Sequence, residues 1–371
     1  MFEFSISEDD VGVRVDKFLR RQFPDVPKSH LFKLIRTKNV RLNNKRAKPG
    51  QLLVEGNVLS IRKALEALSR SPNAPPQSPK GAPPHRSPSA PPSHFPNKAS
   101  FEGRRPLKPY IPLPILHEDD WILVVNKPAG MAVHPGSGIP HGTVVDFVRA
   151  YLGEKAVRNG FSASPAHRLD KDTSGVLVVA KRRPAMVHFT KLLTEGKIKK
   201  RYFALVQGRM PSPRGKIEVA LAERQQSHAS KQKHGRRMQE ARTLWQQLEC
   251  QNGCALLSVV LETGRTHQIR RHFSSWNRPV LGDTRYGDFA FNRIAKKRWG
   301  LGRMFLHACT LEFAHPKSGE KMYMQATLPA ELNMVLANMG FLSHNEAELQ
   351  LSNPEAHLEK KAKKEKKEEG R

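Results

Sequence analysis

The nine residues HRLDKDTSG, at positions 167–175, stand directly before the apolar run VLVVAK at 176–181. An apolar run of this length, bounded by a glycine and by charged residues, is typical of a buried β-strand. The polar string before it therefore predicts a loop that presents several charged groups at one edge of a sheet.

Two simpler interpretations of this loop are a calcium-binding loop and an ordinary turn. Asp170, Asp172 and Ser174 alternate before Gly175 as calcium ligands would, but the twelfth position is Lys181, where a bidentate Glu is required. An ordinary Asp-rich turn explains any single member of the string and explains the whole string poorly. The loop is therefore a candidate site of chemistry.

Apolar or alternating runs of strand length recur through the same part of the chain and predict a sheet. They are WILVVNK, GVLVVAK, RYFALVQG, TLWQQLEC, CALLSVVLE, MFLHACTLEF and KMYMQATL. Helical patterns lie between some of them: GTVVDFVRAYLG, with a capping box from Thr143 to Asp146, PAMVHFTKLLTEG and RTHQIRRHFSSW. A mixed, sheet-centred α+β domain is the expectation.

A proline-rich stretch divides the chain. Residues 71–114 hold 14 of the 28 prolines, so this segment should be extended and solvated. We expect a small basic domain over residues 1–62, a disordered linker over 63–110, a catalytic domain over 111–332 and a C-terminal extension over 333–371. The Lys/Glu-rich tail LEKKAKKEKKEEGR closes that extension.

The N-terminal domain contains two helical patterns, VRVDKFLRRQFP and a second that has Ser29 as its candidate cap, followed by a short strand, a turn at Asn43-Asn44 and a strand near Val58. Between Lys28 and Lys48 there are eight Lys or Arg residues and no acidic one. A nucleic-acid-binding face is favoured over an ordinary solvated one. The expected phosphate contacts are Lys28, Lys33, Arg36, Lys38 and Arg41.

Charge and composition limit the function classes. The formal net charge of +29 over 371 residues favours a polyanionic partner. No apolar run reaches the roughly 18 residues of a membrane span, and the start, MFEFSISEDD, does not resemble a targeting signal. Three cysteines are too few for a disulfide framework. A soluble, cytoplasmic protein without a membrane partner is expected.

Common cofactor signatures are missing. His134, His141, His267 and His272 lack metal-binding spacing, and Cys250 with Cys254 forms a lone CxxxC, so no metal site is expected. The chain contains neither a phosphate-binding GxxxxGK[ST] nor a complete dinucleotide fingerprint, and no nucleotide cofactor is expected. The serine-hydrolase motif GxSxG is also missing.

The string HRLDKDTSG closely resembles the signature of the RluA family of pseudouridine synthases. Further matches follow in order over about residues 111–332: NKPAGMAVHPG, RYFALVQG, TGRTHQIR, GDTRYG and FLHACTLEFAHP. The basic domain before the linker resembles the alpha-L RNA-binding domain of some ribosomal proteins. The long proline-rich linker departs from a typical family member.

The resemblance implies roles for particular residues. Asp170 would be the catalytic aspartate, with Arg265 as the arginine that pairs with it. Tyr202 would stack on the flipped base and assist catalysis, and Arg168 would fill the space that this base leaves in the RNA stack. His167, in the same motif, is a further candidate RNA contact.

The fold implied is a pseudouridine synthase domain on a mixed, mainly antiparallel sheet flanked by helices. The activity implied is the isomerisation of uridine to pseudouridine in structured RNA, without a cofactor. A monomer is expected. Large-subunit ribosomal RNA is the favoured substrate. The alternatives are a transfer-RNA substrate, or a catalytically silent RNA-binding or ribosome-assembly factor.

Overall fold

The computed structural model describes residues 2–62, 112–136, 138–222 and 238–341. The chain divides into two compact units at the boundary between Ile111 and Pro112. The expected linker over 63–110 and the charged end of the chain lie outside the described residues. Each unit is described by itself.

The first unit places two helices against a small antiparallel sheet. The helices are α1 (Val15–Gln22) and α2 (Lys28–Arg36), preceded by the short 3-10 turn η1 (Glu8–Asp10). The strands run in the order β1 (Phe2–Ser5), β4 (Val58–Ile61), β2 (Val40–Leu42) and β3 (Lys45–Arg46). Leu31 and Ile35 of α2 pack with Phe18 of α1 in one apolar core, which confirms the predicted helical stripes.

Two local predictions for this unit had different outcomes. The turn at Asn43-Asn44 is confirmed, with positive φ angles of 47° and 63° that suit a two-residue hairpin. Ser29 as the helix cap is wrong, because α2 already begins at Lys28 with Pro27 as its N-cap. Pro27 has a φ of −54°, close to the helical value that the proline ring imposes, and its extended ψ of 139° lets the helix start directly after it.

The second unit is built on a long, mixed sheet, as predicted. Its strands run in the order β12 (Arg214–Glu218), β15 (Arg242–Gln251), β16 (Cys254–Leu261), β11 (Lys199–Gln207), β17 (Leu306–Ala314), β10 (Ser174–Ala180), β6 (Ile122–Lys127) and β5 (Ile115–Glu118). β18 (Lys321–Gln325) pairs with β17, and β9 (Ser164–Pro165) pairs with β10. The pairing of β10 with β17 is parallel, whereas the other pairings along this path are antiparallel.

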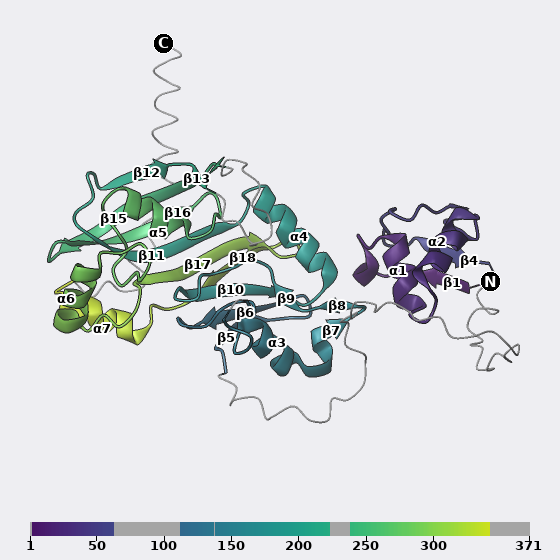
Figure 1. Cartoon of the computed structure of the whole chain (residues 1–371), viewed down its shortest axis with the longest axis horizontal. Coiled ribbons are helices and arrows are strands. Elements are labelled where there is room, and N and C mark those ends of the chain that lie inside the picture. The colour runs from purple at the N-terminus through teal and green to yellow at the C-terminus, as the bar shows by residue number, and fades with distance from the viewer. Residues whose placement is uncertain (1, 63–111, 137, 223–237, 342–371) are drawn as a thin grey trace, which may run out of the picture. The chain divides into compact units, whose positions relative to one another are not determined.

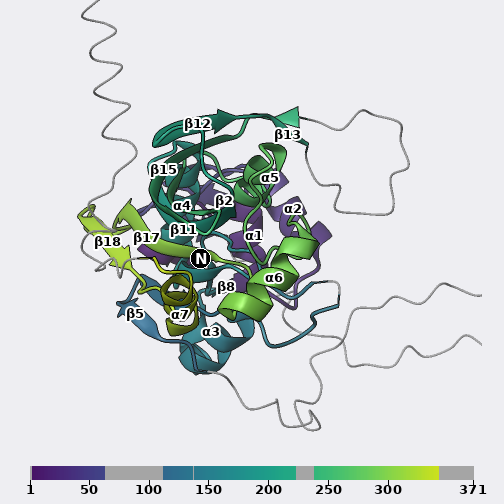
Figure 2. The ribbon, with the colours of Figure 1, turned by 90° about the vertical axis from the view of Figure 1, so that its left-hand side faces the viewer.

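Helices cover both faces of this sheet. They are α3 (Val144–Leu152), α4 (Arg183–Thr194), α5 (Gln268–Ser275), α6 (Phe289–Trp299) and α7 (Ala330–Asn338). Along β11, Tyr202 and Ala204 join the core that includes α3 and α5, while Phe203 and Leu205 join the core under α6 and α7. Both ribbon views place α3 beside β5 at one end of the sheet and β12 at the other end (Figures 1 and 2).

Several short elements complete the unit: η3 (Gly153–Ala156) and two small two-stranded sheets, β7 (Val157–Arg158) with β8 (Phe161–Ser162) and β13 (Leu221–Ala222) with β14 (Met238–Gln239). The predicted capping box is confirmed, since the Thr143 side chain accepts from the backbone N–H of Asp146 and the Asp146 side chain accepts from that of Thr143. Helix α7 crosses the expected boundary at residue 332. Leu336 and Phe341 pack into the same core as α6, so the folded body continues to residue 341.

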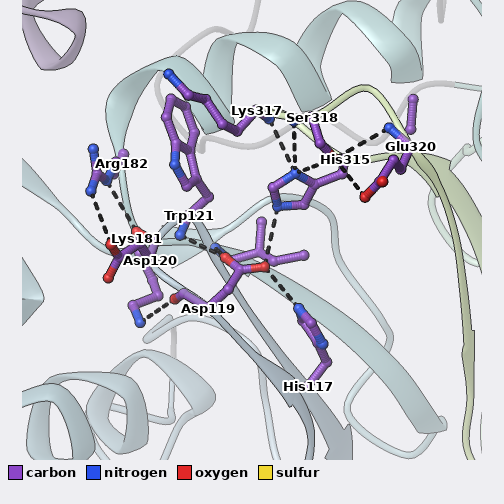
Figure 3. Close-up of polar contacts among 12 residues, drawn as sticks. His117, Asp119, Asp120, Trp121, Lys181, Arg182, His315, Lys317, Ser318 and Glu320 are labelled. Carbon is purple, nitrogen blue, oxygen red and sulfur yellow. Dashed lines mark hydrogen bonds and ion pairs between the residues drawn. The ribbon is translucent and has the colours of Figure 1, made fainter.

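Asp119 joins two hairpins at one edge of this body (Figure 3). Its Oδ1 accepts from the backbone N–H groups of Trp121 and Ile122, at 2.7 and 2.8 Å, within the β5–β6 turn. Its Oδ2 lies 2.8 Å from His117 and 3.1 Å from His315, which follows β17. Burial alone would raise the pKa of Asp119, but these hydrogen bonds hold it below its ordinary value. The carboxylate is therefore a structural clamp between β5–β6 and β17–β18.

Candidate active site

The loop that carries Asp170 is fixed where β10 begins. Gly175 has a φ of +119°, and a Cβ at this position would lie 2.1 Å from the carbonyl oxygen of Ala308 on the parallel neighbour β17. Only glycine fits this close approach. Ser174, beside it, accepts a hydrogen bond from Arg303 at 3.0 Å and contacts His307 at 2.8 Å. The end of the loop is thus held tightly against the sheet.

Lys127, at the end of β6, braces the same loop from inside the protein. Its side chain is fully buried, and its Nζ donates to the carbonyl oxygens of Pro128, Met131 and Lys171 at 2.9, 2.8 and 3.0 Å. Burial lowers the pKa of Lys127 to about 7, against the charges of Asp172 and Asp170. Because Lys171 follows Asp170 directly, the bond from Lys127 fixes the backbone next to the carboxylate.

Arg270 of α5 is the cation that contacts Asp170. Its Nη1 donates to Asp170 Oδ2 at 3.0 Å, while its Nε and Nη2 hold both oxygens of Asp283 at 2.7 and 2.9 Å. Asp283 is buried and also accepts from the backbone N–H groups of Arg285 and Tyr286. Burial opposes the charge on Arg270, but the two carboxylates raise its pKa. The guanidinium is therefore oriented by Asp283 and aimed at Asp170.

This arrangement corrects the expected role of Arg265. Its Nε donates instead to the backbone oxygen of Glu240 at 3.0 Å, and Arg270 makes the ion pair with Asp170 that was expected of Arg265. The reason is positional. Arg265 lies in the exposed turn before α5, whereas Arg270 lies on the buried side of the helix, against the sheet.

His267 lies near the other carboxylate oxygen of Asp170. It is the N-cap of α5 and adopts the left-handed conformation, with a φ of 55°, which is uncommon for a residue other than glycine. Its Nε2 lies 3.8 Å from Asp170 Oδ1, and its Nδ1 lies 3.1 Å from the hydroxyl of Tyr286. Burial lowers the pKa of His267, although the charge of Asp170 opposes this shift.

Tyr202, on β11, lines the same cavity as Asp170. Burial and the negative charge of Asp170 both raise the pKa of its hydroxyl. The phenol is therefore uncharged at neutral pH, where it can donate a hydrogen bond or stack on a planar group.

His167 and Arg168 begin the loop and also line the cavity. Nε2 of His167 accepts from the backbone N–H of Val178 at 3.2 Å, and burial lowers the pKa of this histidine to about 3, so it is neutral. Arg168 is exposed. The structure brings His167, Arg168, Asp170 and Tyr202 together as expected. Arg265 lines the same cavity, although its Nε bonds Glu240 and not Asp170.

The basic residues of the first unit form a separate group. Lys28, Lys33, Arg36 and Lys38 are exposed, and Arg41 is partly buried on β2. The Lys28 ammonium lies 5.6 Å from the ring centre of Phe32, and the first turn of α2 has no acidic residue. This helix therefore presents positive charge to solvent.

The cavity around Asp170 has a volume of about 600 Å³ and is walled by β11, the start of α5 and the end of α4. Within the described ranges, no three His, Cys, Asp or Glu side chains are grouped so that they could hold a metal ion. No helix in those ranges is long and apolar enough to cross a membrane.

The sequence prediction did not include three residues that form this site, Lys127, Arg270 and Asp283. All three lie inside the strings that carry the family resemblance: Lys127 in NKPAG, Arg270 in TGRTHQIR and Asp283 in GDTRYG. For Lys127 and Arg270 the available signal was a charged residue at the end of an apolar run or inside a helical pattern, whereas Asp283 stands in a polar turn that gives no such signal.

Two parts of the chain match known protein families. Residues 121–275 match the family described as RNA pseudouridylate synthase, and residues 13–59 match the S4 domain. The ribosomal large subunit pseudouridine synthase C of Escherichia coli (strain K12) is 34% identical over 339 residues, which cover 90% of this chain and 95% of that protein. The protein of the same name from Buchnera aphidicola subsp. Acyrthosiphon pisum (strain APS) is 33% identical, over 89% of this chain and 95% of its own length.

Among solved structures, human RNA pseudouridylate synthase domain containing 4 is similar, with a TM-score of 0.51 and 26% identity. The match covers 62% of this chain and 95% of the human chain.

Proposed function

The chain belongs to the RNA pseudouridylate synthase family, and from that premise we propose that it isomerises uridines in large-subunit ribosomal RNA, with Asp170 as the catalytic carboxylate. The observation that carries the assignment of Asp170 is its ion pair with Arg270 at the wall of a cavity that Tyr202 also lines.

The reaction rearranges one nucleotide and needs no second reactant. The bond from ribose C1′ to uracil N1 breaks, the uracil turns, and a bond from C1′ to C5 forms. The hydrogen on C5 leaves as a proton, and N1 gains one. The Asp170 carboxylate serves either as a nucleophile at C1′ or as a base at the ribose. Both routes need a carboxylate held at one wall of the cavity, where Asp170 lies.

The surrounding residues would support this step in different ways. Arg270 balances the charge of Asp170 and holds one of its oxygens, while Lys127 fixes the adjoining backbone. Tyr202 would stack on the uracil as an uncharged phenol. In that form it can make a hydrogen bond or take part in the transfer of the C5 proton after the new bond has formed. Arg168, exposed at the rim, would fill the gap that the flipped base leaves.

The S4 domain would supply RNA affinity through the basic residues of α2 and β2. The choice of large-subunit ribosomal RNA rests on the names of the bacterial relatives, which match along nearly their whole length. Transfer RNA is the second candidate substrate. Action in the cytoplasm and as a monomer stays a prediction.

Release of tritium tests the proposal directly, because the hydrogen on C5 of the target uridine is lost to water. RNA labelled at C5 of uridine would be offered as protein-free large-subunit ribosomal RNA and, separately, as transfer RNA. We expect release from the ribosomal RNA, and a loss of about a thousandfold or more in Asp170→Asn with RNA affinity nearly unchanged.

Release from transfer RNA alone would overturn the choice of substrate. Near-normal release by Asp170→Asn would remove Asp170 from its catalytic role.

A further inference from the structure

Lys200 is a further cation that lines the cavity, besides Arg168, Arg265 and Arg270. It lies two residues before Tyr202 on β11, and side chains two apart on a strand point to the same face. The pairing of β11 with β16 runs without a shift from Lys200 to Tyr202, and both residues line the cavity that contains Asp170. Lys200 therefore lies next to Tyr202 on the cavity side of β11, beside the place where the base would stack.

The ammonium group of Lys200 is close to the loop before α5. A Cβ built on Gly264 would lie 3.4 Å from Lys200 Nζ, and Gly264 lines the same cavity. The side chain is partly buried, and burial lowers its pKa. Its positive charge adds to burial in lowering the pKa of His167. These contacts place the charge on the cavity wall near His167.

No acidic side chain in the described part of the chain forms an ion pair with Lys200. Arg270, in contrast, is balanced by Asp283 and Asp170, and the nearby Lys197 pairs with Glu195 at 2.8 Å. Glu262 also lines the cavity, but it is exposed and lies beyond ion-pair distance of Lys200. A partly buried ammonium without a counter-ion is costly, and a bound anion would remove that cost.

We infer that Lys200 binds a phosphate of the RNA strand next to the target uridine and so holds the flipped nucleotide over Asp170. This inference rests on the proposed function. Uracil and ribose are neutral, so the phosphodiester groups are the anions that the RNA offers to this cation. The spacing of the two side chains along β11 would place the flipped base at Tyr202 and the phosphate beside the same nucleotide at Lys200.

The test compares Lys200→Gln with Lys199→Gln. Lys199 is exposed and points to the opposite face of β11, so its change removes the same charge outside the cavity. The substrate is a short RNA with one target uridine, chosen as a fragment that the wild-type enzyme modifies. We expect Lys200→Gln to raise KM by about ten- to a hundredfold with little change in kcat. Lys200→Arg should recover part of the loss, and Lys199→Gln should stay near the wild type.

Replacing single phosphates of the RNA by uncharged methylphosphonates identifies the contact without any protein variant. With the wild type, one linkage beside the target uridine should raise KM as much as Lys200→Gln does. With Lys200→Gln, the same replacement should add nothing further.

The inference would be overturned if the losses from Lys200→Gln and from the methylphosphonate multiplied at every linkage tested. A Lys200→Gln enzyme with normal KM would also overturn it. A fall in kcat alone would also overturn it and place Lys200 at the uracil or at Asp170. Failure of the proposed function is distinct, because the wild type would then modify none of the RNAs offered.

Discussion

Nη1 of Arg270 lies 3.0 Å from Oδ2 of Asp170, although the two residues are 100 positions apart in the chain. The other two guanidinium nitrogens are held by Asp283, which is itself fixed by backbone N–H groups. The orientation of Asp170 therefore depends on how α5 packs against the sheet.

Arg270→Gln should lose far more activity than Arg265→Gln. The first change leaves Asp283 buried without its cation, so we expect a loss of about 3–5 kcal/mol in the free energy of unfolding and about a hundredfold or more in kcat/KM. The second breaks an exposed contact to Glu240 and should cost less than about tenfold. Urea unfolding and tritium release measure both effects.

Arg270→Lys serves as the control for charge alone. A lysine keeps the positive charge but cannot bond Asp170 and Asp283 together, so activity should recover only in part. A larger loss in Arg265→Gln than in Arg270→Gln would return the pairing role to Arg265.

Gly175→Ala should destabilise the catalytic body and displace the Asp170 loop. The added Cβ would meet the Ala308 oxygen at 2.1 Å, at a φ of +119° that alanine rarely adopts, so we expect a loss of about 2–4 kcal/mol. Gly302→Ala is the matched control, because a Cβ there has no neighbour within 4 Å. Equal thermal midpoints for the two variants would show that β10 and β17 can separate without cost.

Local features of this fold could be predicted because their causes are local. The capping box of Thr143 with Asp146 and the turn at Asn43-Asn44 depend on residues within four positions of one another. The predicted start of α2 at Ser29 was wrong, because Pro27, two residues earlier, already takes the N-cap position. Apolar runs likewise predicted the strands, though not their order in the sheet.

The site was predictable only in part, for a related reason. His167, Arg168 and Asp170 share one short loop, so their proximity follows from the sequence. The choice between Arg265 and Arg270 depends on which side of α5 faces the sheet, and only tertiary packing decides that. The burial of Lys127 against three carbonyl oxygens is likewise a product of loop closure.

His307 should make the stability of the catalytic body depend on pH. The His307 side chain is fully buried. Its Nδ1 contacts the hydroxyl of Ser174, which also accepts a hydrogen bond from Arg303, and its Nε2 donates to the backbone oxygen of Ala326. Burial lowers its pKa to about 4, below the value of about 6.5 in an unfolded chain. The unfolded state therefore binds more protons between pH 4 and 6.5, and this contribution to stability is lost as pH falls through that window.

The expected loss is about 3 kcal/mol between pH 7 and pH 4 from this group alone. Urea unfolding of the wild type, His307→Gln and the exposed control His141→Gln across this range separates its contribution. His307→Gln should show a flatter dependence on pH than the other two. An unchanged dependence in His307→Gln would mean that other groups cause the acid sensitivity.

The basic residues of α2 and β2 should set the salt dependence of RNA binding. Replacing Lys33, Arg36, Lys38 and Arg41 by Gln should weaken binding and flatten the plot of log affinity against log salt by two to four contacts' worth, each about 0.7 for single-stranded RNA. Turnover at saturating RNA should change little, because no member of this set lines the cavity around Asp170. The matched control removes four exposed cations from α6, namely Arg293, Lys296, Lys297 and Arg298. Equal slopes for the two quadruple variants would show that the charged face of α2 is an ordinary solvated surface and that phosphate contacts lie elsewhere in the chain.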